Sequence, residues 1–144
     1  MSGIVHDFPV FARRDDVFAA VSTPEGLDRW WTQTSAGSAG VGDVWTLGFG
    51  PDHQWEATVT ACVAGFEIEW ELTRAQEDWV GTRVALHLDE VGPKHTNVRF
   101  RHSGWRTTDA HFRTSSYCWA MYLRILKRAV EHGEDVAYDR RLDV

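Results

Sequence analysis

The sharpest candidate for chemistry in this chain is a histidine near the end of a predicted strand. His102 opens the stretch 102–105 (His-Ser-Gly-Trp), and alternation with Val98 and Phe100 places it on the inward face. An inward histidine could hold the polar group of a ligand, or act as an acid or base near neutral pH. It could equally be a structural histidine whose hydrogen bonds are satisfied by its neighbours. The sequence leaves both interpretations open.

Tryptophan is unusually frequent, with eight residues in 144. Alternation predicts that Trp55 and Trp70 face inward, and Trp119 lies on the apolar stripe of a predicted helix. Trp31 and Trp105 sit at the ends of elements, where a cavity would open. Single aromatic residues usually belong to the core, but several that converge with a few polar groups are typical of a small-molecule site.

The predicted site combines these residues with neighbours on the same strand and helix. Ser116, on the apolar helix stripe, could supply a hydrogen bond to a ligand or bond to its own helix backbone. Trp79, beside a predicted turn, is expected to be exposed. The predicted ligand-binding residues are Trp31, Trp55, Trp70, Phe100, His102, Trp105, Phe112, Ser116, Trp119 and Leu123.

Other kinds of site have little support. The seven histidines show no HxxxH or HExxH spacing, and the two cysteines do not form a CxxC pair. There is no GxSxG nucleophile motif, and the glycine-rich stretch 37–42 lacks the lysine of a phosphate loop. We therefore expect no metal and no cofactor, and the sequence favours a binding protein over an enzyme.

Composition limits the partners and the location. The net charge of −6 disfavours nucleic acid and anionic membranes as partners, and no apolar run reaches the length of a membrane span. Residues 1–11 lack the basic start and apolar core of a signal peptide, and Cys62 and Cys118 fit reduced, buried thiols. These features predict a soluble, cytoplasmic protein.

The periodicity predicts one α+β domain over residues 1–144. Two short helices follow the first strand, residues 35–42 form a loop, a long helix over 109–132 ends at Gly133, and 134–144 form a polar tail. In the clearest strand, Phe66, Ile68, Trp70 and Leu72 alternate with glutamates. Strands are predicted over 4–11, 44–49, 54–63, 66–72, 82–88 and 96–102. Their short spacing favours a six-stranded, curved antiparallel sheet around the long helix, with the first strand beside the last.

Four stretches in this order resemble a known family: DVFAAV over 16–21, TPEGLDRWW over 23–31, HSGW over 102–105, and the helix from Trp119 to Gly133. They resemble the SRPBCC superfamily with its START-like helix-grip fold, and more narrowly the heat-shock-protein ATPase activator homologue (AHSA-type) group. The resemblance implies an apolar cavity between sheet and helix. The co-chaperone that names the group has a further N-terminal domain, so its activity is not carried over.

Three functions follow as hypotheses. The favoured one is a carrier or sensor that binds a small hydrophobic molecule, aromatic or lipid-like, in the cavity. The second is a cyclase or aromatase with His102 as its acid–base group, although the sequence offers no second acid–base partner for that histidine. The third is a co-chaperone-like interaction module, which would need an exposed apolar patch. Homodimerisation through an edge strand or the helix stays open.

Overall fold

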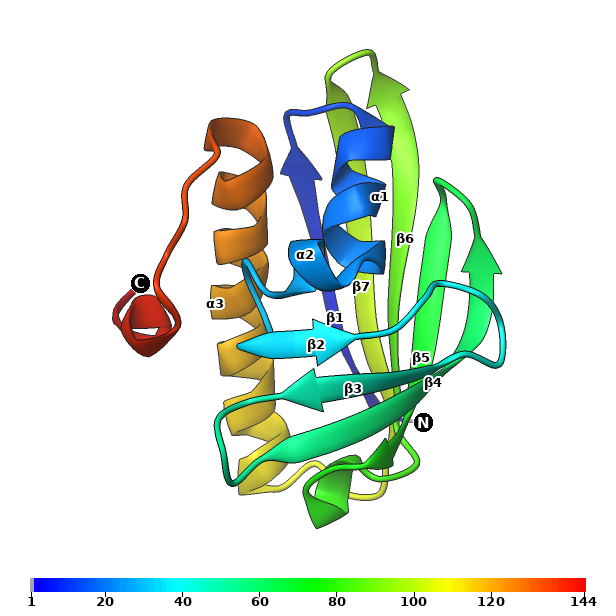
Figure 1. Cartoon of the computed structure of the whole chain (residues 1–144), viewed down its shortest axis with the longest axis vertical. Helices are drawn as coiled ribbons and strands as arrows, with labels where there is room; N and C mark the ends of the chain where they lie inside the picture. The colour runs from blue at the N-terminus through cyan, green and yellow to red at the C-terminus, as the bar shows by residue number, and fades with distance from the viewer. Residues whose placement is uncertain (1) are drawn as a thin grey trace.

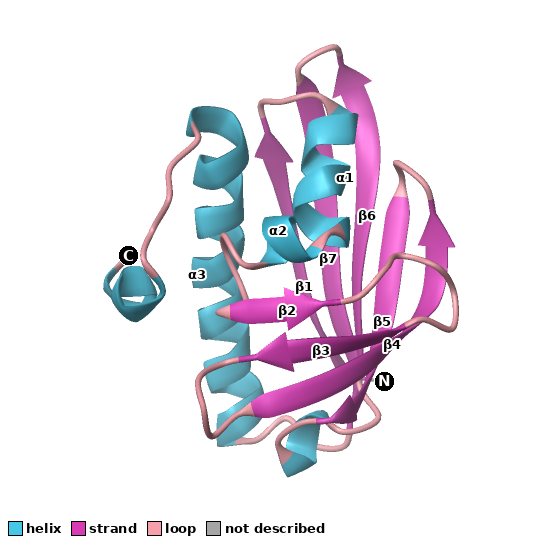
Figure 2. Ribbon diagram, viewed as in Figure 1, coloured by secondary structure: helices cyan, strands magenta, loops and turns pink. Residues whose placement is uncertain are grey.

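The computed structural model describes residues 2–144 (Figures 1 and 2). The strands are β1 (Ser2–Val10), β2 (Thr34–Ala36), β3 (Val44–Gly48), β4 (Gln54–Val63), β5 (Glu67–Arg74), β6 (Arg83–Gly92) and β7 (His95–Trp105). The helices are α1 (Arg14–Ser22), α2 (Pro24–Leu27) and α3 (Ala110–His132), with 3-10 turns η1 (Glu77–Trp79) and η2 (Tyr138–Asp143). The predicted order of elements is confirmed, with boundaries shifted by a few residues.

All strands join one antiparallel sheet in the order β1-β7-β6-β5-β4-β3-β2. The first strand pairs with the last, as predicted, with Ile4 opposite His102. The sheet has seven strands rather than six, because residues 34–36, at the start of the predicted loop, pair with β3 through Ser35 and Leu47. A strand of three small residues is too short to show an alternation, so periodicity could not reveal it.

The sheet curves around α3, and α1 and α2 cover the upper part of its concave side (Figure 2). This is the helix-grip arrangement, and the core lies between the layers. Trp45, Trp70, Phe100 and Trp119 are among its largest fully buried side chains. The helix α3 ends at Gly133, whose positive φ of 66° lets its N–H bond to the carbonyl of Ala129.

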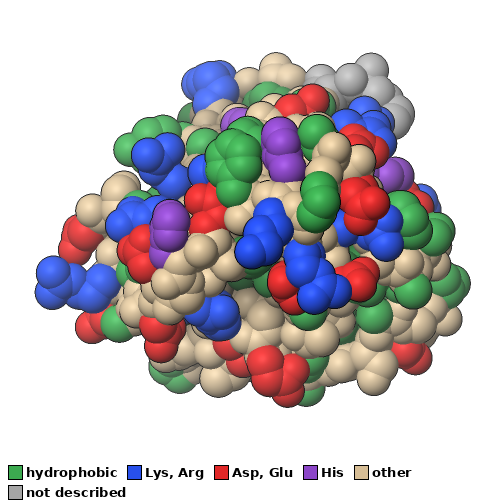
Figure 3. Space-filling model, turned by 90° about the horizontal axis from the view of Figure 1, so that it is seen from above, with side chains coloured by type: hydrophobic (Ala, Val, Ile, Leu, Met, Phe, Trp, Pro, Cys, Tyr) green, Lys and Arg blue, Asp and Glu red, His purple; other side chains and the backbone are tan. Residues whose placement is uncertain are grey.

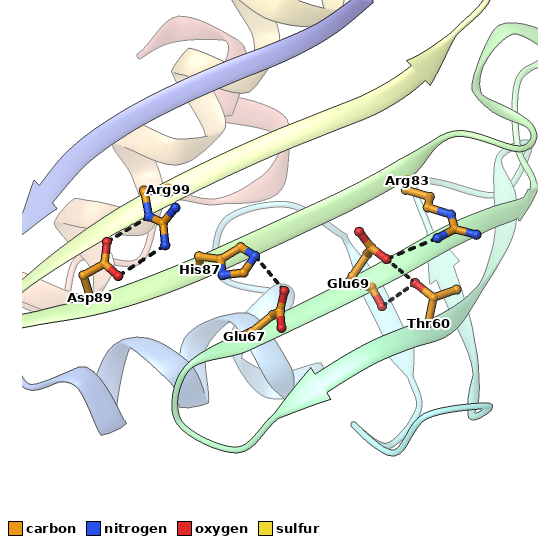
Figure 4. A network of polar contacts seen from close by, with 7 residues as sticks. All are labelled: Thr60, Glu67, Glu69, Arg83, His87, Asp89 and Arg99. Carbon is orange, nitrogen blue, oxygen red and sulfur yellow. Dashed lines mark hydrogen bonds and ion pairs between the residues drawn. The ribbon is translucent and has the colours of Figure 1, made fainter. Parts of the chain in front are cut away.

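The convex face of the sheet carries charge pairs between neighbouring strands, as the alternation predicts (Figure 4). Arg99 bonds to Asp89 (Nε–Oδ2, 2.8 Å), and His87 lies 2.6 Å from a carboxylate oxygen of Glu67. Seen from above in Figure 3, acidic and basic side chains are interspersed rather than separated by sign. The convex face of the sheet is a solvated surface. No helix among residues 2–144 is long and apolar enough to cross a membrane.

One residue of the clearest alternation does not follow it. The alternation predicts that Phe66 faces inward, but its side chain is 45% exposed. The strand β5 begins at Glu67, so Phe66 belongs to the preceding turn and the parity of the strand does not extend to it. Its ring instead lies 3.9 Å from the guanidinium carbon of Arg14, a cation–π contact.

Candidate functional site

The histidine at the end of β7 is fully buried, and both of its ring nitrogens are occupied. Trp119 Nε1–H donates to His102 Nδ1 at 3.0 Å, and His102 Nε2 lies 2.8 Å from Thr82 Oγ1. Because an indole N–H can only donate, Nδ1 must accept and Nε2 must carry the proton. The Thr82 hydroxyl continues this series of hydrogen bonds by donating to the carbonyl of Trp79 at 2.6 Å. We call Trp119, His102, Thr82 and the Trp79 carbonyl the His102 relay.

The buried position of His102 keeps its imidazole neutral. Burial, with a smaller contribution from His111, lowers the pKa of His102 to about 3. The rings of Trp79 and Trp119 pack against it, with the Trp79 centroid 4.5 Å away. The structure thus gives His102 a complete set of internal hydrogen bonds that ties β7 to α3.

A separate pocket of about 280 Å³ lies beside Trp79, and His102 is not among its lining residues. The β3–β4 hairpin, η1, the first half of α3 and the C-terminal segment together form its walls. Its aromatic lining residues are Trp31, Phe49, Trp55, Trp79, Trp119, Tyr122 and Tyr138. Most of the wall area is therefore apolar ring surface.

The aromatic rings pack against one another around the pocket. Trp79 stacks on Trp119, with centroids 5.7 Å apart and planes 20° from parallel, and lies 5.2 Å from Trp55. Trp31 extends the cluster from Trp119 at 5.1 Å, and Phe49 extends it from Trp55 at 4.8 Å. Trp31, Trp79 and Trp119 are buried, whereas Phe49 and Trp55 are partly exposed and form the accessible side.

A few polar groups interrupt this surface. His111 Nδ1 lies 2.9 Å from Asp78 Oδ2 at the mouth, and Ser115 Oγ accepts a hydrogen bond of 3.3 Å from Trp79 Nε1. Burial raises the pKa of the Cys118 thiol and of the Tyr122 hydroxyl, so both stay protonated at neutral pH. The pocket therefore offers neutral hydrogen-bonding groups and no reactive thiolate. Among residues 2–144, no group of histidine, cysteine and carboxylate side chains could hold a metal ion.

Comparison with known families identifies the chain. A family model described as "Activator of Hsp90 ATPase homolog 1-like protein" (AHSA1) matches residues 12–131. The chain belongs to this family. A comparison with curated proteins gave no match. The AHSA1 assignment confirms the predicted AHSA-type and SRPBCC membership.

Solved structures agree with this AHSA1 fold. The Aha1 dimer from Colwellia psychrerythraea shares 30% sequence identity with a TM-score of 0.83, over 93% of this chain and 99% of that one. Protein SSP2350 from Staphylococcus saprophyticus shares 20% identity with a TM-score of 0.79, over 94% of this chain and 96% of that one. CalU16 from Micromonospora echinospora shares 18% identity with a TM-score of 0.74, over 98% and 81%. The last two show the fold alone.

The pocket of this AHSA1-like chain contains three of the predicted ligand-binding residues, Trp31, Trp55 and Trp119. Trp70, Phe100 and His102 lie deeper, fully buried in the core. The remaining four lie elsewhere: Trp105, Phe112, Ser116 and Leu123. Of these, Trp105 and Phe112 pack on each other, the Ser116 carbonyl lies beside His6, and Leu123 lines a groove between α3 and β1. Their predicted role in ligand binding stays a prediction.

Sequence reasoning missed several residues of the pocket. The sequence predicts an exposed Trp79, but only 8% of its surface is exposed, because η1 turns the ring under the β3–β4 hairpin. Ser115 rather than Ser116 faces the pocket, a difference of one position around the helix. The spacing His111, Ser115, Trp119 is i, i+4, i+8, which places the three on one helical face and could have found this serine.

Proposed function

We propose that the chain binds a small apolar, aromatic molecule in the pocket, as a carrier or sensor. The observation that carries this proposal is the lining of seven aromatic side chains around about 280 Å³ of space. Small-molecule pockets are typically lined by hydrophobic and aromatic side chains with a few placed polar groups, and span about 300–1,000 Å³. A volume near the lower limit favours a compact ligand of one or two fused rings.

The polar groups support the same proposal. The carboxylate of Asp78 orients His111 at the mouth, and Ser115 lies one helical turn further along α3. Such groups could fix the orientation of a ligand that carries one polar substituent. The cyclase or aromatase alternative relied on His102, which has both ring nitrogens bonded inside the protein and does not line the pocket. No observation favours that alternative, and none favours a co-chaperone-like module.

Intrinsic tryptophan fluorescence tests the proposal, because four tryptophans line the pocket. Titration with naphthalene and with 2-naphthol should give a saturable change in intensity or emission wavelength, with one binding site per chain. Adipate is the control, since a non-aromatic dianion of similar size would lose its hydration against the aromatic lining without compensation. A linear, non-saturating response to all three compounds would remove the proposal.

Two further expectations remain proposals. The relative from Colwellia psychrerythraea is described as a dimer, which supports self-association of this chain as well. Light scattering coupled to gel filtration measures the oligomeric state directly.

The two cysteines are free, which supports a reducing, cytoplasmic location.

A further inference from the structure

The C-terminal segment, residues 134–144, is tied into the fold by a buried arginine. It leaves the end of α3, turns back along the helix and closes with η2 (Figure 1). Arg141 in η2 is 4% exposed. It donates to the carbonyl of Thr32 from Nη1 (3.0 Å), to that of Asp28 from Nη2 (2.5 Å) and to that of Val136 from Nε (3.3 Å). The predicted polar tail is therefore a docked segment.

These bonds are specific rather than incidental. The acceptors Asp28 and Thr32 follow α2, more than a hundred positions away in the sequence, and Thr32 is fully buried. If the guanidinium were removed, the carbonyl of the fully buried Thr32 would be left without this donor, which is costly. By contrast, the neighbouring Leu142 is 74% exposed. Arg141 thus holds the end of the segment against the α2–β2 connection, and Arg29 Nη2 donates to the carbonyl of Glu134 (3.1 Å) at its start.

The same segment supplies a wall of the pocket. Tyr138 lines the pocket, and its ring centroid lies 5.3 Å from the guanidinium carbon of Arg141. Tyr122 lines the same pocket, and burial, with a smaller contribution from the Tyr138 hydroxyl, raises its pKa. The match to the AHSA1 family ends at residue 131, before this segment begins. One wall of the pocket therefore comes from a segment beyond the residues that the family model matches.

We propose that residues 134–144 form a wall of the ligand pocket that Arg141 holds in place, and that Tyr138 determines which ligands the pocket admits. This inference rests on the proposed binding function. With Tyr138 in place, the pocket is bounded on the side of Tyr122 and suits flat molecules of one or two rings. Without it, the pocket extends outward along α3 and accepts a longer ring system.

The first experiment tests, without any ligand, whether Arg141 holds the segment in place. Arg141→Ala is compared with Arg140→Ala, a matched control whose arginine is exposed and pairs only with Asp143 on its own segment. Hydrogen exchange of the amides in 134–144 should accelerate at least about tenfold in Arg141→Ala, the factor that corresponds to loss of one hydrogen bond to a charged donor. It should stay at the wild-type rate in Arg140→Ala. Equal exchange in all three proteins would overturn this role of Arg141.

The second experiment tests the wall with two probes of different length, naphthalene and pyrene. The ratio of their dissociation constants should shift about tenfold toward pyrene in Tyr138→Ala and in Arg141→Ala. It should not shift in Leu142→Ala, which removes an exposed side chain from the same segment. Tyr138→Phe keeps the ring and should keep the wild-type ratio.

The outcomes separate this inference from the function on which it rests. Saturable binding of naphthalene with an unchanged ratio in Tyr138→Ala would overturn the wall and leave the proposed function standing. A lower unfolding temperature in Arg141→Ala with wild-type selectivity would reduce the segment to a structural tether, which also overturns the inference. Failure of the wild-type protein to bind either probe would overturn the proposed function itself.

Discussion

Two regions that share Trp79, the His102 relay and the pocket, differ in the hydrogen-bonding groups and ring surface that they leave available to a ligand. In the His102 relay, every hydrogen-bonding group of the imidazole has a partner and the ring is sealed by tryptophans. In the pocket, His111 is held through Nδ1 alone and the aromatic faces of Phe49 and Trp55 are partly exposed. The first region holds the fold together, and the second has surface left over for a ligand.

This contrast shows that a side chain can face the interior of the protein without facing a ligand. Alternation along β7 correctly placed His102 on the inward face of the sheet. There it lies in the buried core and does not line the pocket. A period of two reports the face of the sheet on which a side chain lies and says nothing of its depth. The variants below separate the two regions, because damage to the relay or core should change stability, and damage to the pocket should change affinity.

The largest expected effect is in the core. Trp70→Ala should lower the free energy of unfolding by about 3–5 kcal/mol, since a fully buried indole is replaced by a cavity. Trp70 Nε1 is buried without a hydrogen-bond partner, so Trp70→Phe loses no such bond and should cost clearly less. Urea unfolding measures both. Equal costs for the two variants would contradict this account of Trp70.

The next effect depends on pH and isolates the relay. The pKa of His102 is about 3 in the folded protein, against 6.5 for an unperturbed histidine, so the unfolded chain binds the extra proton first as the pH falls. The stability that the neutral ring provides is complete above pH 6.5 and is lost as the pH falls toward 3. At pH 4.5 the loss should be about 3 kcal/mol, since two pH units separate this pH from the unperturbed pKa of 6.5.

Urea unfolding of His102→Gln between pH 7 and pH 4.5 measures this effect. Glutamine can donate and accept but does not titrate in this range, so the variant should be flatter with pH than the wild type. His132→Gln is the control, because His132 is exposed on the last turn of α3. A wild-type slope in His102→Gln would mean that the ring is not held neutral by burial.

A smaller effect is expected in the pocket. Trp55→Ala should weaken binding of 2-naphthol about tenfold, roughly 1.4 kcal/mol, because it removes an accessible aromatic wall. Its cost in stability should be below that of Trp70→Ala, since Trp55 is only partly buried. Isothermal titration calorimetry measures the affinity. Phe66→Ala removes an exposed ring outside the pocket lining and should bind as the wild type does; weakened binding there would argue against a local effect.

The smallest effect is expected on the convex face. Arg83 pairs with Glu69 at 3.6 Å and with Glu71 at 3.4 Å, and half of its side chain is exposed. Arg83→Ala should change the unfolding free energy by less than about 1 kcal/mol, as exposed ion pairs do, and leave affinity unchanged. Urea unfolding in low and high salt checks this. A cost comparable to that of Trp70→Ala would show that the outer charge network stabilises the fold.

Most of the fold could be predicted because its signals are local and repeated. Alternation located β4 to β7, and Gly133 marked the end of α3. The strand β2 escaped because three residues carry no period, and Phe66 was misplaced because a turn interrupts the parity of β5.

The site was less accessible to sequence reasoning. Trp79 reaches the pocket through a 3-10 turn, and Tyr138 through a segment fixed by Arg141, so both depend on contacts between distant parts of the chain. No periodicity encodes such contacts. Local signals of the pocket were the alternation that placed Trp55 inward, the apolar helix stripe that contains Trp119, and the 111–115–119 spacing on α3, since residues four apart share a helical face.

The central claim is that the pocket beside Trp79, rather than the His102 relay, receives the ligand. Mapping of amide and indole NMR shifts during titration with 2-naphthol tests it most directly. The account predicts saturable shifts in residues 49–55 and 76–79, in Ser115 and Trp119 of α3, and in the indole signals of Trp55 and Trp79. The amides of the groove around Phe8 and Lys127 should stay unchanged. Shifts confined to that groove, or no saturable shifts at all, would contradict it.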